Sequence, residues 1–204
     1  MEAATAGGFQ AAALEKVGEL LRCNPLDAIS RHLQVVLLVW NGQPEAALAE
    51  VGHAISLGLS PLWMEDALFL TLLAQRRADD PQAQGPAGPL TWMRFPREIL
   101  ALAMQGDAAA ARAMAEQYWS RPDADDYSSL IVAASIGDRE RANRYAARID
   151  GRPGGSHVLL DSAYVCACGA PFDVEAAPVF KRKLAQSGLS WPPAAPLQFP
   201  DKGW

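Results

Sequence analysis

The chain has 204 residues, half of them hydrophobic, which is enough for one or two folded domains with a sizeable core. Its net charge of −5 argues against an extended nucleic-acid surface, because phosphate binding needs clustered Lys and Arg. The densest basic clusters, 76–77 and 181–183, are typical of the last turns of helices. The longest strongly apolar stretch, 33–40, is far shorter than the ~20 residues that a membrane-spanning helix needs, so no membrane partner is expected.

The N-terminus and the cysteines bear on the cellular compartment. Residues 1–8 carry Glu2 and no Lys or Arg ahead of an apolar run, which is unlike a secretory signal. The three cysteines, Cys23, Cys166 and Cys168, are an odd set in a chain of this size, so we do not expect a disulfide framework. The sequence therefore predicts a cytoplasmic protein.

Helical spacing dominates the sequence from end to end. Alanine, leucine and charged residues recur with helical period, whereas no stretch alternates with period two between hairpin turns. Breaks of Gly, Pro, Asn and Asp separate the periodic segments, so the sequence predicts an all-α protein. In chain order, the expected helices span 10–23, 27–41, 44–57, 61–77, 92–105, 107–120, 124–136, 138–150, 156–168 and 176–187.

The glycines between these segments are regularly spaced. Gly42 follows Gly8 by 34 residues, Gly106 follows Gly42 by 64, and Gly137 and Gly169 follow at intervals of 31 and 32. Two helices of about 13 residues and two short turns form a unit of this length, and a period near 34 is that of the tetratricopeptide repeat.

The second helix of each expected unit carries small or apolar residues at three matching positions. These sets are Ala13, Val17 and Leu20; Ala47, Val51 and Ala54; Ala111, Ala115 and Tyr118; and Ala142, Ala146 and Ile149. Short side chains allow two helices to approach to ~8–10 Å. With these residues the chain resembles the tetratricopeptide-repeat family, although the family's Trp, Leu-Gly and Tyr positions are not matched in 27–41. The resemblance implies antiparallel helical hairpins stacked as a right-handed α-solenoid.

Two proline-rich segments interrupt the helical pattern. Three Pro and two Gly in 79–90 cannot continue a helix, so we expect a flexible loop between helical repeats at 1–78 and 91–187. The final segment, 188–204, contains four Pro among large apolar residues, which predicts an extended cap packed on the last repeat. The stretch 166–204 also resembles the closing part of bacterial tetratricopeptide-containing regulator proteins.

The first expected helix, 10–23, aligns with second helices, so its first-helix partner is missing. An unpaired solenoid end exposes an apolar face unless something caps it. Either the chain is a piece of a longer protein, or another chain covers that face and forms a homo-oligomer through the N-terminal helix.

The cysteine pair is the first candidate for chemistry. A structural metal site needs about four ligands, and Cys166 and Cys168 have only His157, Asp161 and Asp173 nearby in sequence. Two Cys spaced by two on a helix also point in different directions. We therefore expect small buried helix residues and no metal; a redox pair is the remaining alternative.

No other motif indicates an enzyme. His32, His53 and His157 lie on separate expected helices, and HExxH, GxSxG, Walker and GxGxxG motifs are absent from the sequence. The acidic run 123–126 lacks the ligand spacing of a calcium loop and is interpreted as a helix cap. The sequence therefore predicts no catalytic residue and no cofactor. Two glycine pairs are interpreted as turns: Gly7-Gly8 and Gly154-Gly155.

A stack of helical hairpins presents a long concave face built from its first helices. The family resemblance therefore implies a non-catalytic scaffold that binds a protein or peptide, and one or two of the six Trp would anchor that partner. The candidate groove residues are Arg31, Gln34, Leu38 and Asn41. The alternative is a sensor or dimerisation domain from a longer bacterial regulator or cyclase-like signalling protein.

Overall fold

The computed structural model describes residues 2–59, 61–77, 80, 91–165, 171–189 and 191–193. Only the backbone is described at 2–10, 61–62, 91–94 and 164–165. The chain divides into two compact units, Met1–Pro89 and Leu90–Trp204. The described residues contain helices and no strand, so the expected all-α class is confirmed.

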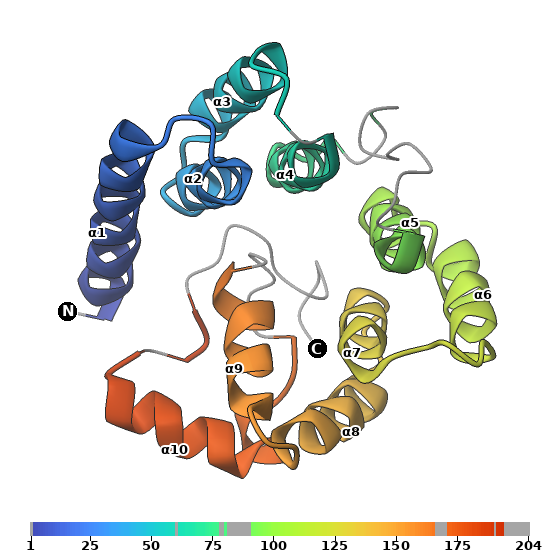
Figure 1. Ribbon diagram of the computed structural model, residues 1–204. Coiled ribbons are helices and arrows are strands. Elements are labelled where there is room, and N and C mark those ends of the chain that lie inside the picture. The colour runs from blue at the N-terminus through green and yellow to red at the C-terminus, as the bar shows by residue number, and fades with distance from the viewer. Residues whose placement is uncertain are drawn as a thin grey trace. The chain divides into compact units, whose positions relative to one another are not determined.

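The first unit is built around its second helix (Figure 1), because α2 contacts all three other helices and α3 also packs on α4. Inside the unit, α2 and α4 therefore lie side by side with α3 across them and α1 on the other flank of α2. The four helices are α1 (Glu2–Cys23), α2 (Ala28–Trp40), α3 (Pro44–Ser56) and α4 (Pro61–Ala74).

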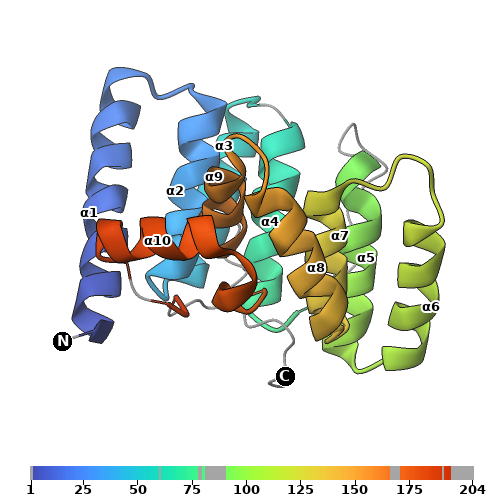
Figure 2. The ribbon, with the colours of Figure 1, turned by 90° about the horizontal axis from the view of Figure 1, so that it is seen from below.

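The second unit repeats the hairpin arrangement. Consecutive helices α5 and α6, and then α7 and α8, form antiparallel pairs; α7 also packs on α5, and α9 packs on α8 and α10 (Figure 2). The helices are α5 (Thr91–Gln105), α6 (Ala108–Trp119), α7 (Asp126–Ser135), α8 (Arg139–Asp150), α9 (Gly155–Leu160) and α10 (Pro178–Ser187), with a π-helical turn at Asp161–Val165 and a 3-10 turn at Val174–Ala176.

Two expected boundaries are wrong. The helix expected at 10–23 begins at Glu2 and runs through Gly7-Gly8, where a turn was expected. Alanine on both sides of this pair, the residue with the highest helix propensity, sustains the helix through it. The helix expected at 156–168 leaves the α-helical path at Asp161 for a π-helical turn, and residues 166–170 lie outside the described part.

Helices α2, α4, α5 and α7 are among those followed by a residue with positive φ, at Gly42, Arg76, Gly106 and Gly137 respectively. In each turn the next amide reaches back to a carbonyl of the last helical turn, which is the Schellman arrangement. Arg76 has a φ of 60° and follows Gly42 by 34 residues. The interval of 64 residues between Gly42 and Gly106 therefore contains a further helix-ending turn of this kind, at a residue that is not glycine.

Gly42 and Gly52 are expected to respond to alanine in opposite directions. An added Cβ meets no atom within 4 Å at either position, but only Gly42 has a positive φ, of 69°. Gly42→Ala should lower the free energy of unfolding by about 1–2 kcal/mol because an L-residue is strained there. Gly52→Ala, inside α3, should raise it by about 0.5–1 kcal/mol. Urea titration measures both; shifts of the same sign would contradict the expectation.

The small residues expected in the second helices form the inner faces of the hairpins. The expected triplets of α3, α6 and α8 are all buried, and they are Ala47, Val51, Ala54, Ala111, Ala115, Tyr118, Ala142, Ala146 and Ile149. In α1 the expectation fails at Leu20, which is 57% exposed, while its neighbour Leu21 is buried. The α1 stripe that packs on Leu37 of α2 contains Val17 and Leu21, so its register differs by one residue from the family pattern.

Only the start of the expected C-terminal cap lies within the described residues. Helix α10 spans Pro178–Ser187 with Gly188 as its C-cap, close to the expected 176–187. Beyond it, the Trp191 ring packs 5.1 Å from that of Phe172 and 5.3 Å from that of Phe180, measured between centroids. Residues 194–204 lie outside the described part, so the folded cap over 188–204 stays a prediction, as does the loop at 79–90.

Candidate functional site

A polar contact joins α2 and α4 on the seam where these two helices meet. His32 Nε2 lies 2.8 Å from Asp66 Oδ2, and the two residues are 34 positions apart. The ring of Trp63 lies 5.2 Å from that of His32, tilted by 57°. The His32 and Asp66 side chains are only 13% and 19% exposed. The seam therefore combines an aromatic ring with a partly buried acid–imidazole pair.

Contacts between residues 34 apart recur in the second unit. The hydroxyl of Tyr127 on α7 donates at 3.3 Å to Oδ2 of Asp161, at the end of α9. Arg139 at the start of α8 donates to Asp173 at 2.9 Å, ahead of the 3-10 turn. The Glu175 amide and the Arg139 guanidinium lower the pKa of Asp173. Side chains 34 positions apart therefore meet in both units, close to the spacing of the glycines in the sequence.

Contacts within the first unit involve three of the four expected groove residues, namely Arg31, Leu38 and Asn41. Arg31 is buried, ion-paired with Glu50 of α3, and its Nε donates to the Pro25 carbonyl at 3.0 Å. Leu38 belongs to the core that α2 shares with α3 and α4. Asn41 donates to the Leu37 carbonyl at 2.7 Å and ends the helix. Gln34 is partly buried.

These contacts account for Arg31, Leu38 and Asn41 within the hairpin, and a peptide-binding role for the four residues stays a prediction. The seam residue on α2 is instead His32, which sequence reasoning left without a partner. The sequence contains one indication of this contact. Asp66 follows His32 by 34 residues, which is the spacing of Gly8 and Gly42.

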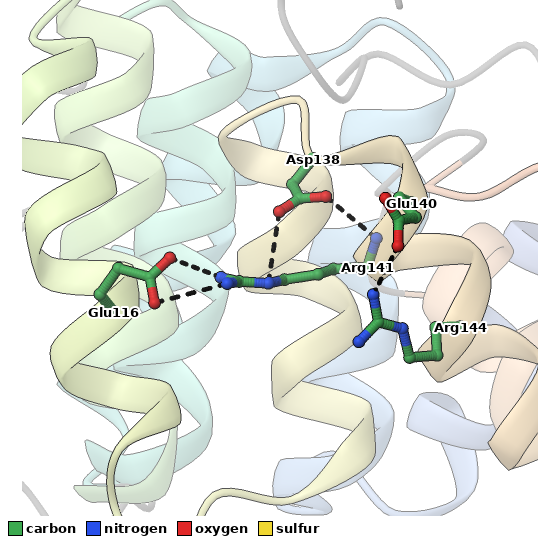
Figure 3. Close-up of polar contacts among 5 residues, drawn as sticks. All are labelled: Glu116, Asp138, Glu140, Arg141 and Arg144. Carbon is green, nitrogen blue, oxygen red and sulfur yellow. Dashed lines mark hydrogen bonds and ion pairs between the residues drawn. The ribbon is translucent and has the colours of Figure 1, made fainter.

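A second polar network joins α6 to α8 (Figure 3). Arg141 of α8 donates to Glu116 of α6 at 2.6 Å, and its Nε lies 3.5 Å from Asp138. Asp138 also accepts a bond from the Arg141 amide at 3.0 Å, which caps α8. The Arg141 guanidinium stacks over the Trp119 ring at 4.0 Å from its centroid. Hydrogen bonding to Glu116 raises the pKa of Arg141, so this cation is permanent.

Helix α8 and the turn after it carry five arginines, and each is paired with a carboxylate. Asp126 of α7, whose side chain is 6% exposed, forms ion pairs with both Arg148 and Arg152. Arg144 pairs with Glu140 on its own helix at 2.8 Å (Figure 3). With the pairs of Arg139 and Arg141 described above, all five arginines have a carboxylate partner, and for four of them this partner lies outside α8.

The other candidates for chemistry remain apart. His53 and His157 are exposed on α3 and α9, and Cys23 is an exposed thiol at the end of α1. Cys166 and Cys168 lie outside the described residues. Within the described part of the chain, no three His, Cys, Asp or Glu side chains come together as a metal site would need.

Two further observations concern the chain as a whole. Among the helices that the structure describes, none is both long and apolar enough to cross a membrane. Comparison with protein-family models, with curated proteins and with solved structures finds no match.

Proposed function

We propose that the chain is a non-catalytic scaffold that binds a protein or peptide partner on tetratricopeptide-like helical hairpins. The observation that supports it most directly is the contact between His32 and Asp66, which are 34 positions apart. In a stack of hairpins, first helices of successive units lie side by side and form one continuous surface. The packing of α2 on α4, with α3 in contact with both, supports such a surface.

The chemistry at the seam fits a peptide anchor. Trp63 is partly buried where α2 and α4 meet, and it lies beside an imidazole and a carboxylate. Aromatic residues with a polar neighbour supply much of the binding energy at peptide-binding surfaces, because they bury a large area and still orient polar groups. As part of the same proposal, the hairpins within each unit stack with a right-handed twist.

Site-specific photo-crosslinking in the source cell tests this function. A benzoylphenylalanine in place of Trp63 keeps a large aromatic side chain at the seam and should capture a discrete protein or peptide. The matched control places the same group at Ala49, an exposed position on α3. Capture at the seam and not at Ala49 is the expected result. Equal capture at both positions, or none at the seam, would rule out the proposed surface.

A further inference from the structure

Exposed aliphatic side chains gather in the first unit. Six large hydrophobic residues in the described part of the chain are exposed, and five of them belong to this unit: Leu20, Leu26, Ile29, Ile55 and Leu57. Their exposed fractions run from 40% to 60%. A cluster of exposed apolar residues marks an interaction surface more often than scattered single residues do.

These five residues, called the apolar rim below, lie at one end of the unit. Leu20 stands in the last turn of α1, Leu26 in the following loop and Ile29 in the first turn of α2. Ile55 and Leu57 lie at the end of α3, which runs antiparallel to α2. The end of α1, the start of α2 and the end of α3 meet at the same edge of the unit (Figure 2).

Arg31 connects the loop that carries Leu26 with α3. Its Nε donates to the Pro25 carbonyl at 3.0 Å, beside Leu26, and its guanidinium pairs with Glu50 in the middle of α3. Asp27 then caps α2 by accepting a bond from the Ser30 amide at 3.2 Å. The loop before α2 is therefore fixed to both α2 and α3.

The same unit carries the whole net charge of the protein. Residues 1–89 contain ten Asp and Glu and five Lys and Arg, which leaves 13 of each for residues 90–204. The net charge of −5 therefore belongs to the first unit, and the second is neutral. Asp27 stands within the rim, and its bonds with Ser30 lower its pKa, so this carboxylate is ionised at neutral pH.

We infer that the apolar rim binds a cationic amphipathic segment of a partner protein, with aliphatic side chains on the rim and Lys or Arg facing the acidic unit. Opposite charges speed the encounter and select the partner, while apolar burial supplies the affinity. A second copy of the same unit would bring a like charge of −5, and an anionic membrane would also repel it. The rim residues differ from His32, Trp63 and Asp66 of the seam, although Ile29 stands one helical turn before His32 on α2.

Fluorescence anisotropy with the full chain tests the rim. The probe is an amphipathic helical peptide of leucine and lysine, and its control is the same pattern with glutamate in place of lysine. Ile29→Ser combined with Ile55→Ser should weaken binding of the lysine peptide by at least about tenfold, since both substitutions remove apolar area that the peptide would bury. Val158→Ser, at a 39% exposed position on α9 of the neutral unit, is the matched control and should leave binding unchanged.

Three results would overturn the inference. Equal weakening by Ile29→Ser/Ile55→Ser and Val158→Ser, or equal binding of both peptides, would mean that the rim is not the site. A wild-type dimer in light scattering that the double substitution dissociates would identify a second copy as the occupant. Leu26→Ser, in the loop, repeats the test if circular dichroism shows that the double variant is unfolded. Crosslinking at Trp63 is scored separately, so the seam and the rim stand or fall independently.

Discussion

Gly155→Ala is expected to destabilise the protein by about 3 kcal/mol or more, because the added methyl group has no space. A Cβ at this position would lie 1.7 Å from the Ile149 carbonyl oxygen and 2.6 Å from its carbon. Both atoms belong to the backbone near the end of α8, so relief requires the helix itself to move away from α9. Forced overpacking of a core costs about 1–3 kcal/mol even where side chains can yield.

Gly151→Ala is the control for this prediction. There the added Cβ would meet the Ala147 carbonyl oxygen at 3.5 Å, an ordinary contact. Its midpoint in urea should stay close to that of the wild type, whereas that of Gly155→Ala should fall strongly. Equal midpoints for the two variants would show that α8 and α9 can separate at little cost.

Asp150→Ala should cost about 3 kcal/mol and loosen α10. The Asp150 carboxylate, at the end of α8, is 5% exposed and accepts bonds from the Val179 and Phe180 amides at 2.8 and 2.9 Å. These amides stand in the first turn of α10, where a negative charge also favours the helix. Each amide left without a partner costs about 1–3 kcal/mol when buried.

The same substitution should be visible in the aromatic cluster that follows. Phe180 packs against Phe172 and Trp191, so release of α10 should shift the fluorescence of Trp191 and speed proteolysis after the Lys181–Lys183 segment. Glu140→Ala is the control, because this carboxylate also stands on α8 but its side chain is 87% exposed. If Glu140→Ala weakens the protein as much as Asp150→Ala, the contact with α10 is not the cause.

Periodicity and turn residues were sufficient to predict the helices of the fold. Their spacing located the ten α-helices of the described residues, and the triplet patterns located the buried faces of α3, α6 and α8. These features are local, because helical period and capping depend on residues a few positions apart. The errors at Gly7-Gly8 and Asp161 have a local origin as well. Glycine within alanine-rich sequence stays helical, and a π-helical turn has no distinctive residue pattern.

The seam and the rim could not be predicted in the same way. The family pattern placed Leu20 on the buried face of α1, whereas Leu21 is the residue that is buried. A shift of one residue along the helix depends on packing against α2. Arg31 looked like a groove residue because it is polar on a first helix, yet its partner, Glu50, lies on the next helix of the hairpin. Contacts of this kind depend on the angle at which two helices cross, and the hydrophobic period of one sequence does not determine that angle.

The 34-residue reach of the contacts bears on how the protein folds. Several side-chain hydrogen bonds connect residues 34 positions apart, as in His32 with Asp66 and Tyr127 with Asp161. Low sequence separation keeps the entropic cost of loop closure small and favours rapid folding. A hairpin that needs only its neighbour can close as soon as that neighbour leaves the ribosome, so folding of each unit can proceed during synthesis from the N-terminal side.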